Sequence, residues 1–280
     1  MAVAAPVAAP AEDGDAAFRP SDLARRDTDR MARYRHNLDF YRGDQWQTSS
    51  RQRQLVFNYA RTAIDKATSY LTAGLGAACY PVEPSDRPDP ALAGRIDKVE
   101  ALLFETEVDC AVLGDACYKV TWDEERERIR ITAPPVSGLY AWWLPDDPSQ
   151  VYCVASRYRM TAGELYLLNG LETPRGPGWV TEYWTPESFF LFVDDRRVQR
   201  AANPYGFIPF VIFPNIREPK QFWGVSDIPA LIEPQRELNR AVSQLSRILE
   251  FSGNPIAVLE NVDAAQDIQT RPGQTWALPE

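Results

Sequence analysis

The segment QFWGVSDIPALIEPQRELNRAVSQLSRILEFSGNPI, from Gln221 to Ile256, decides the fold expected for this chain. Near its start, Ser226 and Asp227 are residue types that cap the exposed amides of a helix. Apolar residues then recur at intervals of 7, 4, 3 and 4, which is the spacing of a helical packing seam. The residues of this seam are Leu231, Leu238, Val242, Leu245 and Leu249.

Two features limit this segment. Pro234 removes a backbone donor inside the helical pattern, so we predict a kink or a restart there. The run Ser252-Gly253-Asn254-Pro255 should end the helix sharply. The sequence therefore predicts one long amphipathic helix over residues 226–251.

Three further helices are predicted upstream. The first begins after Pro20, with Ser21 as its cap, and ends at Gly43. The second covers residues 55–73 and the third residues 90–113, each with an apolar face at helical spacing.

The chemistry of the chain changes after residue 114. Alternating β-branched and aromatic residues predict strands, and charged turns at 123–128 and 194–196 connect pairs of them. The predicted strands cover residues 117–122, 129–132, 151–158, 180–184, 189–193 and 210–213. Helices, a strand-rich middle and one long helix indicate the α+β class.

Composition and residue spacing argue against several classes of function. The net charge of -9 and the pI of about 4.9 disfavour a protein that holds duplex DNA, because such affinity comes mostly from Lys and Arg. The four cysteines form no C-x-x-C pair, and His36 is the one histidine, so spacing offers no metal-ligand cluster. No apolar run reaches the length of a membrane span. Residues 1–20 are predicted to be a disordered arm.

No enzyme signature stands out, and we predict no cofactor and no catalytic or metal site. The chain has neither a phosphate-binding G-x-x-x-x-G-K-[ST] loop nor a G-x-S-x-G elbow. Three acidic clusters lie in predicted turns, where solvated carboxylates are the ordinary interpretation, so a metal-dependent nuclease remains a remote alternative. They are Asp146-Asp147, Asp194-Asp195 and Asp123-Glu124-Glu125. The aromatic pairs, such as Trp142-Trp143, are interpreted as strand core rather than base-stacking residues.

Five segments carry a resemblance in the same order along the chain. They are YRHNLDFYRGDQW (34–46), FNYARTAIDKATSYLTAG (57–74), GDACYKVTWD (114–123), NPYGFIPFVIFPN (203–215) and WGVSDI (223–228). Together they resemble the portal proteins of tailed bacteriophages, the head-tail connectors of the virion. The long helix is similar to the stem helix of that family.

The resemblance implies an arrangement and a function. It implies a wing domain over 21–225, with helices in 21–113 and strands in 114–225, then a stem helix over 226–251 and a partial clip over 252–280. It implies a non-enzymatic homododecameric ring, assembled in the host cytoplasm, at the capsid vertex through which phage DNA is packaged and ejected. The partners implied are further copies of the chain, the terminase large subunit, capsid and scaffold proteins, a head-tail adaptor and the passing double-stranded DNA, with no membrane.

Family members continue into a second stem helix, so we expect this chain to lack the C-terminal part and to expose the apolar seam of its stem. The stem charges Glu233, Arg236, Glu237, Arg240 and Arg247 are the candidate contact residues. They either pair with a neighbouring subunit or touch DNA in the channel, and we favour pairing between subunits. The alternative function is another non-enzymatic phage structural, adaptor or scaffold protein.

Overall fold

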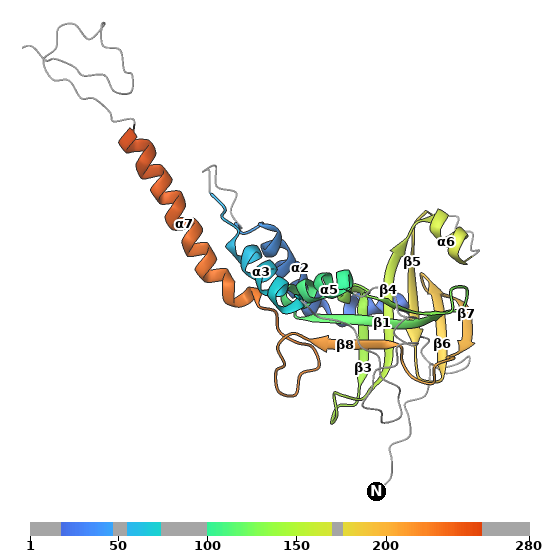
Figure 1. The fold of residues 1–280 in the computed structure, drawn as a ribbon. Helices are drawn as coiled ribbons and strands as arrows, with labels where there is room; N and C mark the ends of the chain where they lie inside the picture. Colours follow the sequence, from blue (N-terminus) through green and yellow to red (C-terminus); the bar gives the residue numbers. More distant parts are fainter. Residues whose placement is uncertain (1–17, 47–54, 74–99, 170–175, 254–280) are drawn as a thin grey trace, which may run out of the picture.

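The computed structural model describes residues 18–46, 55–73, 100–169 and 176–253. These residues form a mixed helix-and-strand fold, so the predicted α+β class is confirmed. Most helices gather at one end of two antiparallel sheets, a short helix over residues 162–169 lies apart beside the larger sheet, and one long helix extends away from the others (Figure 1).

The first predicted helix is divided into short pieces. A 3-10 turn η1 (Pro20–Asp22) leads into α1 (Leu23–Arg26), and α2 (Thr28–Arg42) follows. The predicted cap at Ser21 is wrong, because this residue lies inside η1 and its backbone N–H donates to Asp195 Oδ1 at 2.8 Å. Gly43 does end α2, with a left-handed φ of 103° that glycine adopts without strain.

Two more described helices pack with α2. The helix α3 (Tyr59–Thr72) is capped by Asn58, whose Oδ1 accepts the N–H of Arg61 at 3.2 Å. The helix α5 covers Glu100–Leu113. The first ten residues of the predicted 90–113 helix lie outside the described residues.

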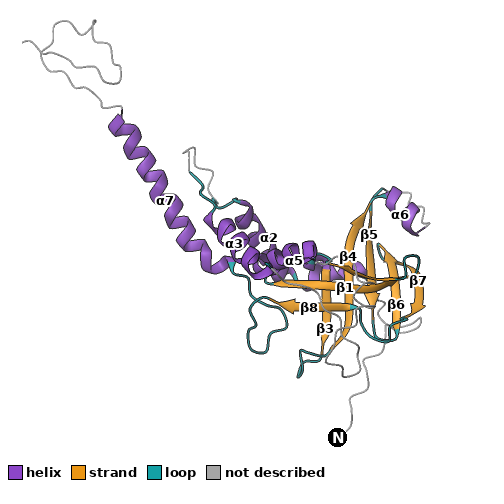
Figure 2. Ribbon diagram, viewed as in Figure 1, coloured by secondary structure: helices purple, strands orange, loops and turns teal. Residues whose placement is uncertain are grey.

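Strands form two sheets. The smaller sheet has the order β2-β1-β8 and the larger one the order β3-β4-β5-β6-β7, and each strand is antiparallel to its neighbours (Figure 2). Their bounds are β1 Asp115–Asp123, β2 Arg128–Thr132, β3 Leu139–Trp143, β4 Val151–Met160, β5 Gly178–Trp184, β6 Ser188–Val193, β7 Arg196–Ala202 and β8 Phe210–Pro214. All six predicted strands are confirmed. The elements β3, β7, α6 (Ala162–Asn169) and the 3-10 turn η2 (Val136–Gly138) were not predicted.

The core has an aromatic part and a helical part. Trp184 and Phe190 are buried on the larger sheet, which confirms that these aromatics serve as strand core. Among the helices, Phe40, Val112 and Ile228 are almost fully enclosed. The described cysteines are buried free thiols, and burial raises the pKa of Cys117, for example, to about 12.

The long helix α7 (Ile228–Gly253) starts at the bundle and then projects beyond it (Figure 1). Ser226 caps it as predicted, because its Oγ accepts the N–H of Ile228 at 3.0 Å. The helix continues through Pro234, so the predicted alternative of a restart is wrong. Among the described helices, none combines the length and the apolar character needed to cross a membrane.

Candidate functional site

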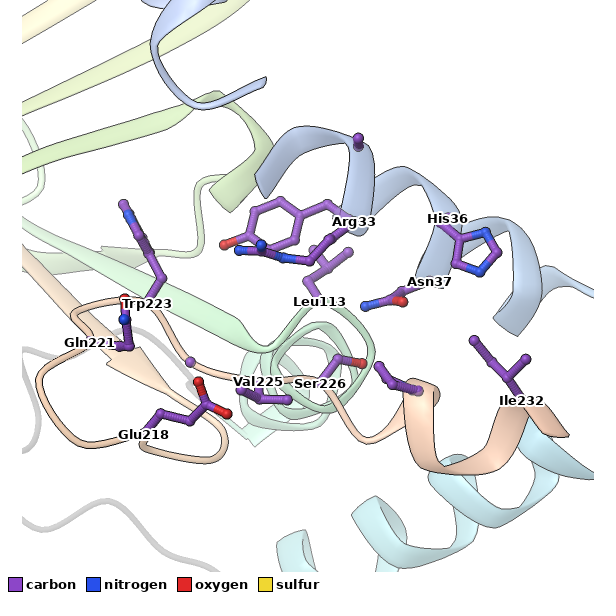
Figure 3. A pocket seen from close by; sticks show the side chains of 14 residues that line it. Arg33, His36, Asn37, Leu113, Glu218, Gln221, Trp223, Val225, Ser226 and Ile232 are labelled. Atoms are coloured by element: carbon purple, nitrogen blue, oxygen red, sulfur yellow. The ribbon is translucent and has the colours of Figure 1, made fainter. Parts of the chain in front are cut away.

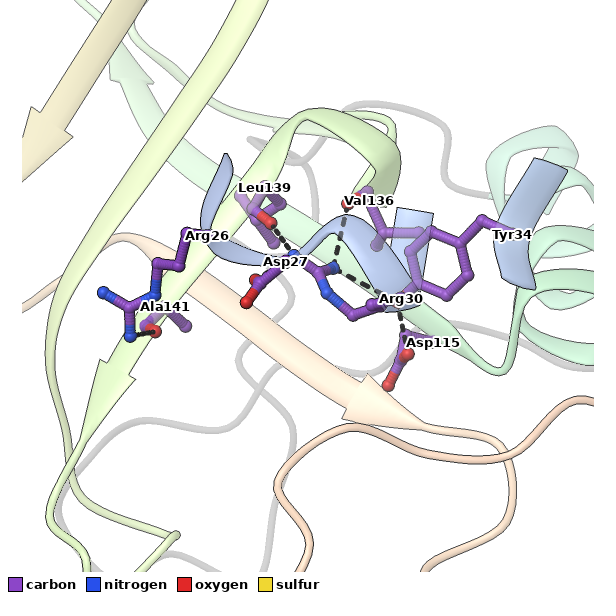
Figure 4. Close-up of polar contacts among 8 residues, drawn as sticks. All are labelled: Arg26, Asp27, Arg30, Tyr34, Asp115, Val136, Leu139 and Ala141. Carbon is purple, nitrogen blue, oxygen red and sulfur yellow. Dashed lines mark hydrogen bonds and ion pairs between the residues drawn. The ribbon is translucent and has the colours of Figure 1, made fainter. Parts of the chain in front are cut away.

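The base of α7 is built on a buried arginine of α2. Arg30 is 4% exposed, and its Nη2 donates to the Leu139 carbonyl and to Asp27 Oδ2, each at 2.7 Å (Figure 4). Its guanidinium carbon lies 3.7 Å from the centre of the Trp223 ring. A buried cation is costly unless it is paired and hydrogen-bonded, and Arg30 is both. It therefore ties α2 to the start of β3 and to the loop before α7.

Asp115, at the start of β1, extends this cluster. Its Oδ2 accepts the hydroxyl of Tyr34 at 2.5 Å, and its Oδ1 accepts the backbone N–H of Gly224 at 2.7 Å. Burial raises the pKa of the Asp115 carboxyl, while these hydrogen bonds and the charge of Arg30 act in the opposite direction. One carboxylate thus joins α2, β1 and the loop before α7.

Two glycines allow the loop to come this close. A Cβ on Gly224 would lie 2.4 Å from the Gly114 carbonyl oxygen and 2.5 Å from Pro214 Cβ. Gly114 has a φ of 101°, and a Cβ there would lie 2.8 Å from the backbone nitrogen of Ser226. All three contacts are shorter than side-chain carbons permit, so both positions need glycine. Asn215 closes the junction by donating to the Val225 carbonyl at 3.2 Å and to Asp227 Oδ1 at 3.0 Å.

A second, uncharged network fixes the direction of α7. Asn239 is fully buried and donates to Gln45 Oε1 at 2.7 Å, while its own Oδ1 accepts the N–H of Phe57 at 2.9 Å. Gln235 accepts the N–H of Ala60 at 3.1 Å and donates to the Phe57 carbonyl. Gln45 also donates to Asn58 Oδ1 at 2.9 Å. The face of α7 that contacts the bundle is therefore apolar at its base, where Ile228, Leu231 and Ile232 pack, and polar at Gln235 and Asn239.

All five segments that carry the portal resemblance meet in these two networks. Tyr34 and Gln45 belong to the first segment, Phe57 and Asn58 to the second and Asp115 to the third. The fourth ends at Asn215 and the fifth contains Gly224. Segments more than a hundred residues apart in sequence thus form one junction at the base of α7.

The predicted apolar seam lies mostly outside this junction. Leu238 is 40% exposed, Leu245 54% and Leu249 63%, and Val242 is half-buried. The seam is thus exposed in the single chain, in agreement with the expectation for a stem without its second helix. The packing residues of α7 that sequence reasoning missed are Gln235 and Asn239. A signal for them was present, because two amides four residues apart lie on one face of a helix.

The candidate stem charges form pairs within their own helix. Arg236 donates to Glu233 at 3.0 Å and Arg240 to Glu237 at 2.6 Å, each across three residues. Arg247 lies exposed further along. At about 100° per residue, the three arginines share the side of α7 opposite the apolar seam. Their contacts with another subunit or with DNA stay predictions.

A groove of about 730 Å³ lies between α2 and the loop before α7 (Figure 3). Arg33, His36 and Asn37 form its α2 wall, while Gln221, Trp223 and Ile232 line other parts of it. His36 is exposed there and shares this wall with the arginine.

The acidic clusters are spread over separate turns. Asp147 Oδ1 accepts the hydroxyl of Ser149 at 2.6 Å and the backbone N–H of Ser149 at 3.0 Å, and these two bonds, in that order, lower the pKa of Asp147. Asp194 Oδ1 accepts the N–H of Trp179 at 3.0 Å, and Asp123 Oδ1 accepts that of Arg126 at 3.2 Å. Within the described part of the chain, no three His, Cys, Asp or Glu residues come together as a possible metal site. Asp123 and Asp147 thus stabilise their own turns, while Asp194 links the turn after β6 to β5.

Comparison with known proteins provides no assignment: no family model and no curated protein matches this sequence.

Proposed function

We propose that this chain is a subunit, or the N-terminal part of a subunit, of a phage portal ring at the capsid vertex. The observation that carries the proposal is the junction at the base of α7. Five portal-like segments converge on it, and it holds a helix whose outer half has no packing partner within the described chain. An apolar stripe on a projecting helix needs a partner, and further copies of the chain supply one in a ring.

The net negative charge of the chain supports a channel through which DNA passes. Many phosphate contacts would hold DNA in place, whereas a net charge of -9 per subunit repels the phosphate backbone. The three stem arginines are available in this arrangement for pairing between subunits, because exposed pairs within one helix contribute little and are easily exchanged. In this proposal the protein performs no chemistry and needs no cofactor.

Native mass spectrometry of the whole chain tests the proposal. We expect a ring of about twelve copies, with size confirmed by electron microscopy of negatively stained particles. Leu245→Glu with Leu249→Glu should abolish the ring and leave the thermal unfolding temperature of the monomer unchanged, because both side chains are exposed.

Gln244→Glu with Ser246→Glu is the matched control. It adds the same charge to the same exposed turns, but about 100° to either side of Leu245. This control should assemble as the unmodified chain does. A chain that stays monomeric at high concentration argues against the portal assignment and favours the alternative of a monomeric adaptor or scaffold protein.

A further inference from the structure

The groove between α2 and the loop before α7 contains a buried amide without a partner in the described part of the chain. Asn37 is 5% exposed, yet its side chain neither donates nor accepts a hydrogen bond with any described residue. The amide lies at the α2 wall of the groove (Figure 3). Buried polar side chains are hydrogen-bonded as a rule, so we expect a ligand in the groove that pairs with this amide.

Two cationic side-chain types lie beside this amide. Arg33, His36 and Asn37 share one face of α2, because spacings of three and four residues bring side chains together on a helix. Arg33 and His36 are exposed, and Arg33 makes no ion pair with a described residue, although its charge reaches the buried Asp115. The carboxylate of Glu218 comes from the opposite wall, on the loop before α7 (Figure 3). On a chain with a net charge of -9, the α2 wall is therefore a local concentration of positive charge.

The other side of the groove is mostly apolar. Trp223 and Val225 line it from the loop, and Pro229 and Ile232 from the first turns of α7. Each of these side chains is only partly covered or exposed. The groove volume of about 730 Å³ lies within the range of about 300–1,000 Å³ that is usual for ligand sites. A ligand in the groove thus meets cations on one side and apolar groups on the other.

The amide of Asn37 indicates a peptide rather than a simple anion. A side-chain amide has N–H donors and a carbonyl acceptor, whereas a carboxylate can only accept hydrogen bonds. A peptide unit has both an N–H and a carbonyl, so it can satisfy both parts of the amide. An acidic side chain on the same peptide can pair with Arg33 and His36, and an apolar side chain beside it can contact Ile232.

We propose that this groove is a docking site for a segment of a partner protein in which an acidic residue is flanked by apolar residues. The backbone of the segment pairs with Asn37, and its carboxylate pairs with Arg33 and His36. The bound segment contacts α2 and the start of α7 together, so it reinforces the junction at the base of the long helix. Docking needs one copy of the chain and does not depend on ring formation.

His36 is the only histidine of the chain, so its reaction with diethyl pyrocarbonate reports on this groove alone. The absorbance of the modified imidazole gives the rate, and the probe is acetyl-Phe-Asp-Leu-amide at millimolar concentration. We expect this peptide to slow the reaction several-fold, because it covers the imidazole. Acetyl-Phe-Asn-Leu-amide, without the charge, and acetyl-Gly-Asp-Gly-amide, without the apolar groups, should protect less. Free N-acetylhistidine with the same peptides corrects for their own reaction with the reagent.

Variants of α2 test the proposed contacts. Arg33→Gln should raise the peptide concentration for half protection about three- to fivefold, because it removes one exposed ion pair. Arg35→Gln is the matched control, since it makes the same charge change on α2 at an exposed residue that does not line the groove. It should leave the protection unchanged. Asn37→Ala should weaken the protection without lowering the thermal unfolding temperature, because the amide loses no described partner.

Three results would overturn the proposal. One is equal protection by the Asp and Asn peptides, or none by either, because the cations would then hold no carboxylate. Another is an Asn37→Ala chain that binds the peptide as the unmodified chain does, or one that unfolds at a much lower temperature, because the amide would then serve the fold. The third is protection of His36 that grows with protein concentration when no peptide is present, because a second copy would then fill the groove. The monomeric Leu245→Glu, Leu249→Glu chain should give the same peptide protection, so failure of this proposal and failure of ring formation are distinguishable.

Discussion

Asn239 holds the long helix in place through hydrogen bonds of its side-chain amide, so its truncation should lower the stability of the protein. It is fully buried, and Asn239→Ala would leave the N–H of Phe57 and the Oε1 of Gln45 without their partner. An unsatisfied buried polar group costs about 1–3 kcal/mol, so the free energy of unfolding should fall by about 2–4 kcal/mol. Urea denaturation measures this loss. Arg240→Ala, one residue along in an exposed pair, should change it by less than about 0.5 kcal/mol; equal losses would contradict the role of the network.

Asp115 should give the stability of the protein a recognisable dependence on pH. Burial raises the pKa of this carboxyl in the folded state above its unfolded value. A group shifted in this direction contributes stability that is fully present below the unfolded pKa and is lost as pH rises through the folded pKa. Asp115→Asn keeps the shape but removes this titration. The free energy of unfolding of the variant, relative to that of the unmodified chain, should therefore be higher at about pH 7 than at about pH 4.

Denaturation of both proteins at the two pH values provides the measurement for Asp115. The variant is expected to fold, because the oxygen of the introduced amide can still accept the N–H of Gly224. A difference in the free energy of unfolding that is the same at both pH values would show that burial does not disfavour the charged carboxylate.

At the scale of elements, the sequence predicts the strands and helices that have a periodic residue pattern. It misses those that form only because they pair with another strand. The predicted strands have alternating apolar and polar residues or are rich in β-branched and aromatic residues. All six of them form strands in the structure. The edge strand β7 carries Arg196, Arg197 and Arg200, so its sequence resembles a charged loop. Only pairing with β6 makes it a strand, and charged residues are typical of protected sheet edges.

The missed helix α6 had a local signal. Thr161 and Glu164 form a capping box, in which the Glu164 carboxylate accepts the N–H of Thr161 at 2.7 Å and the Thr161 hydroxyl accepts that of Glu164 at 3.3 Å. The strand β3 had a partial signal, because Trp142-Trp143 was interpreted as strand core. Its first three residues are all buried, so no alternation marked where the strand begins.

The junction itself could be foreseen only in part. The five segments drew attention to the correct residues, since Gly114, Gly224 and Asp115 all lie within them. That Gly114 and Gly224 approach each other's backbone follows from long-range packing, which no local pattern encodes. The inward face of α7 was misjudged for the same reason: Asn239 and Gln235 are buried because they accept the backbone N–H groups of Phe57, just before α3, and of Ala60, in its first turn.

At the scale of the whole molecule, assembly should strengthen as salt is added. Each copy carries a net charge of -9, so bringing copies together costs electrostatic repulsion that salt screens beyond about 10 Å at 0.1 M. The exposed stripe of α7 favours association through apolar burial, which salt does not weaken. Sedimentation velocity at about 20 mM and about 300 mM NaCl should show a larger assembled fraction at the higher concentration.

The stem arginines determine how that result is interpreted. If Arg236 and Arg240 supply most of the affinity by pairing with a neighbouring copy, association would weaken with salt, and replacing both by glutamine would abolish the ring. If they contact DNA instead, the same replacement should leave assembly intact and change the amount of DNA packaged. If the apolar stripe dominates and the arginines only select the neighbour's register, the glutamine variant should assemble with somewhat lower affinity and keep the same response to salt. We expect this third outcome, because each arginine already has an acidic partner three residues away in its own helix, so that an exchange of partners gains little.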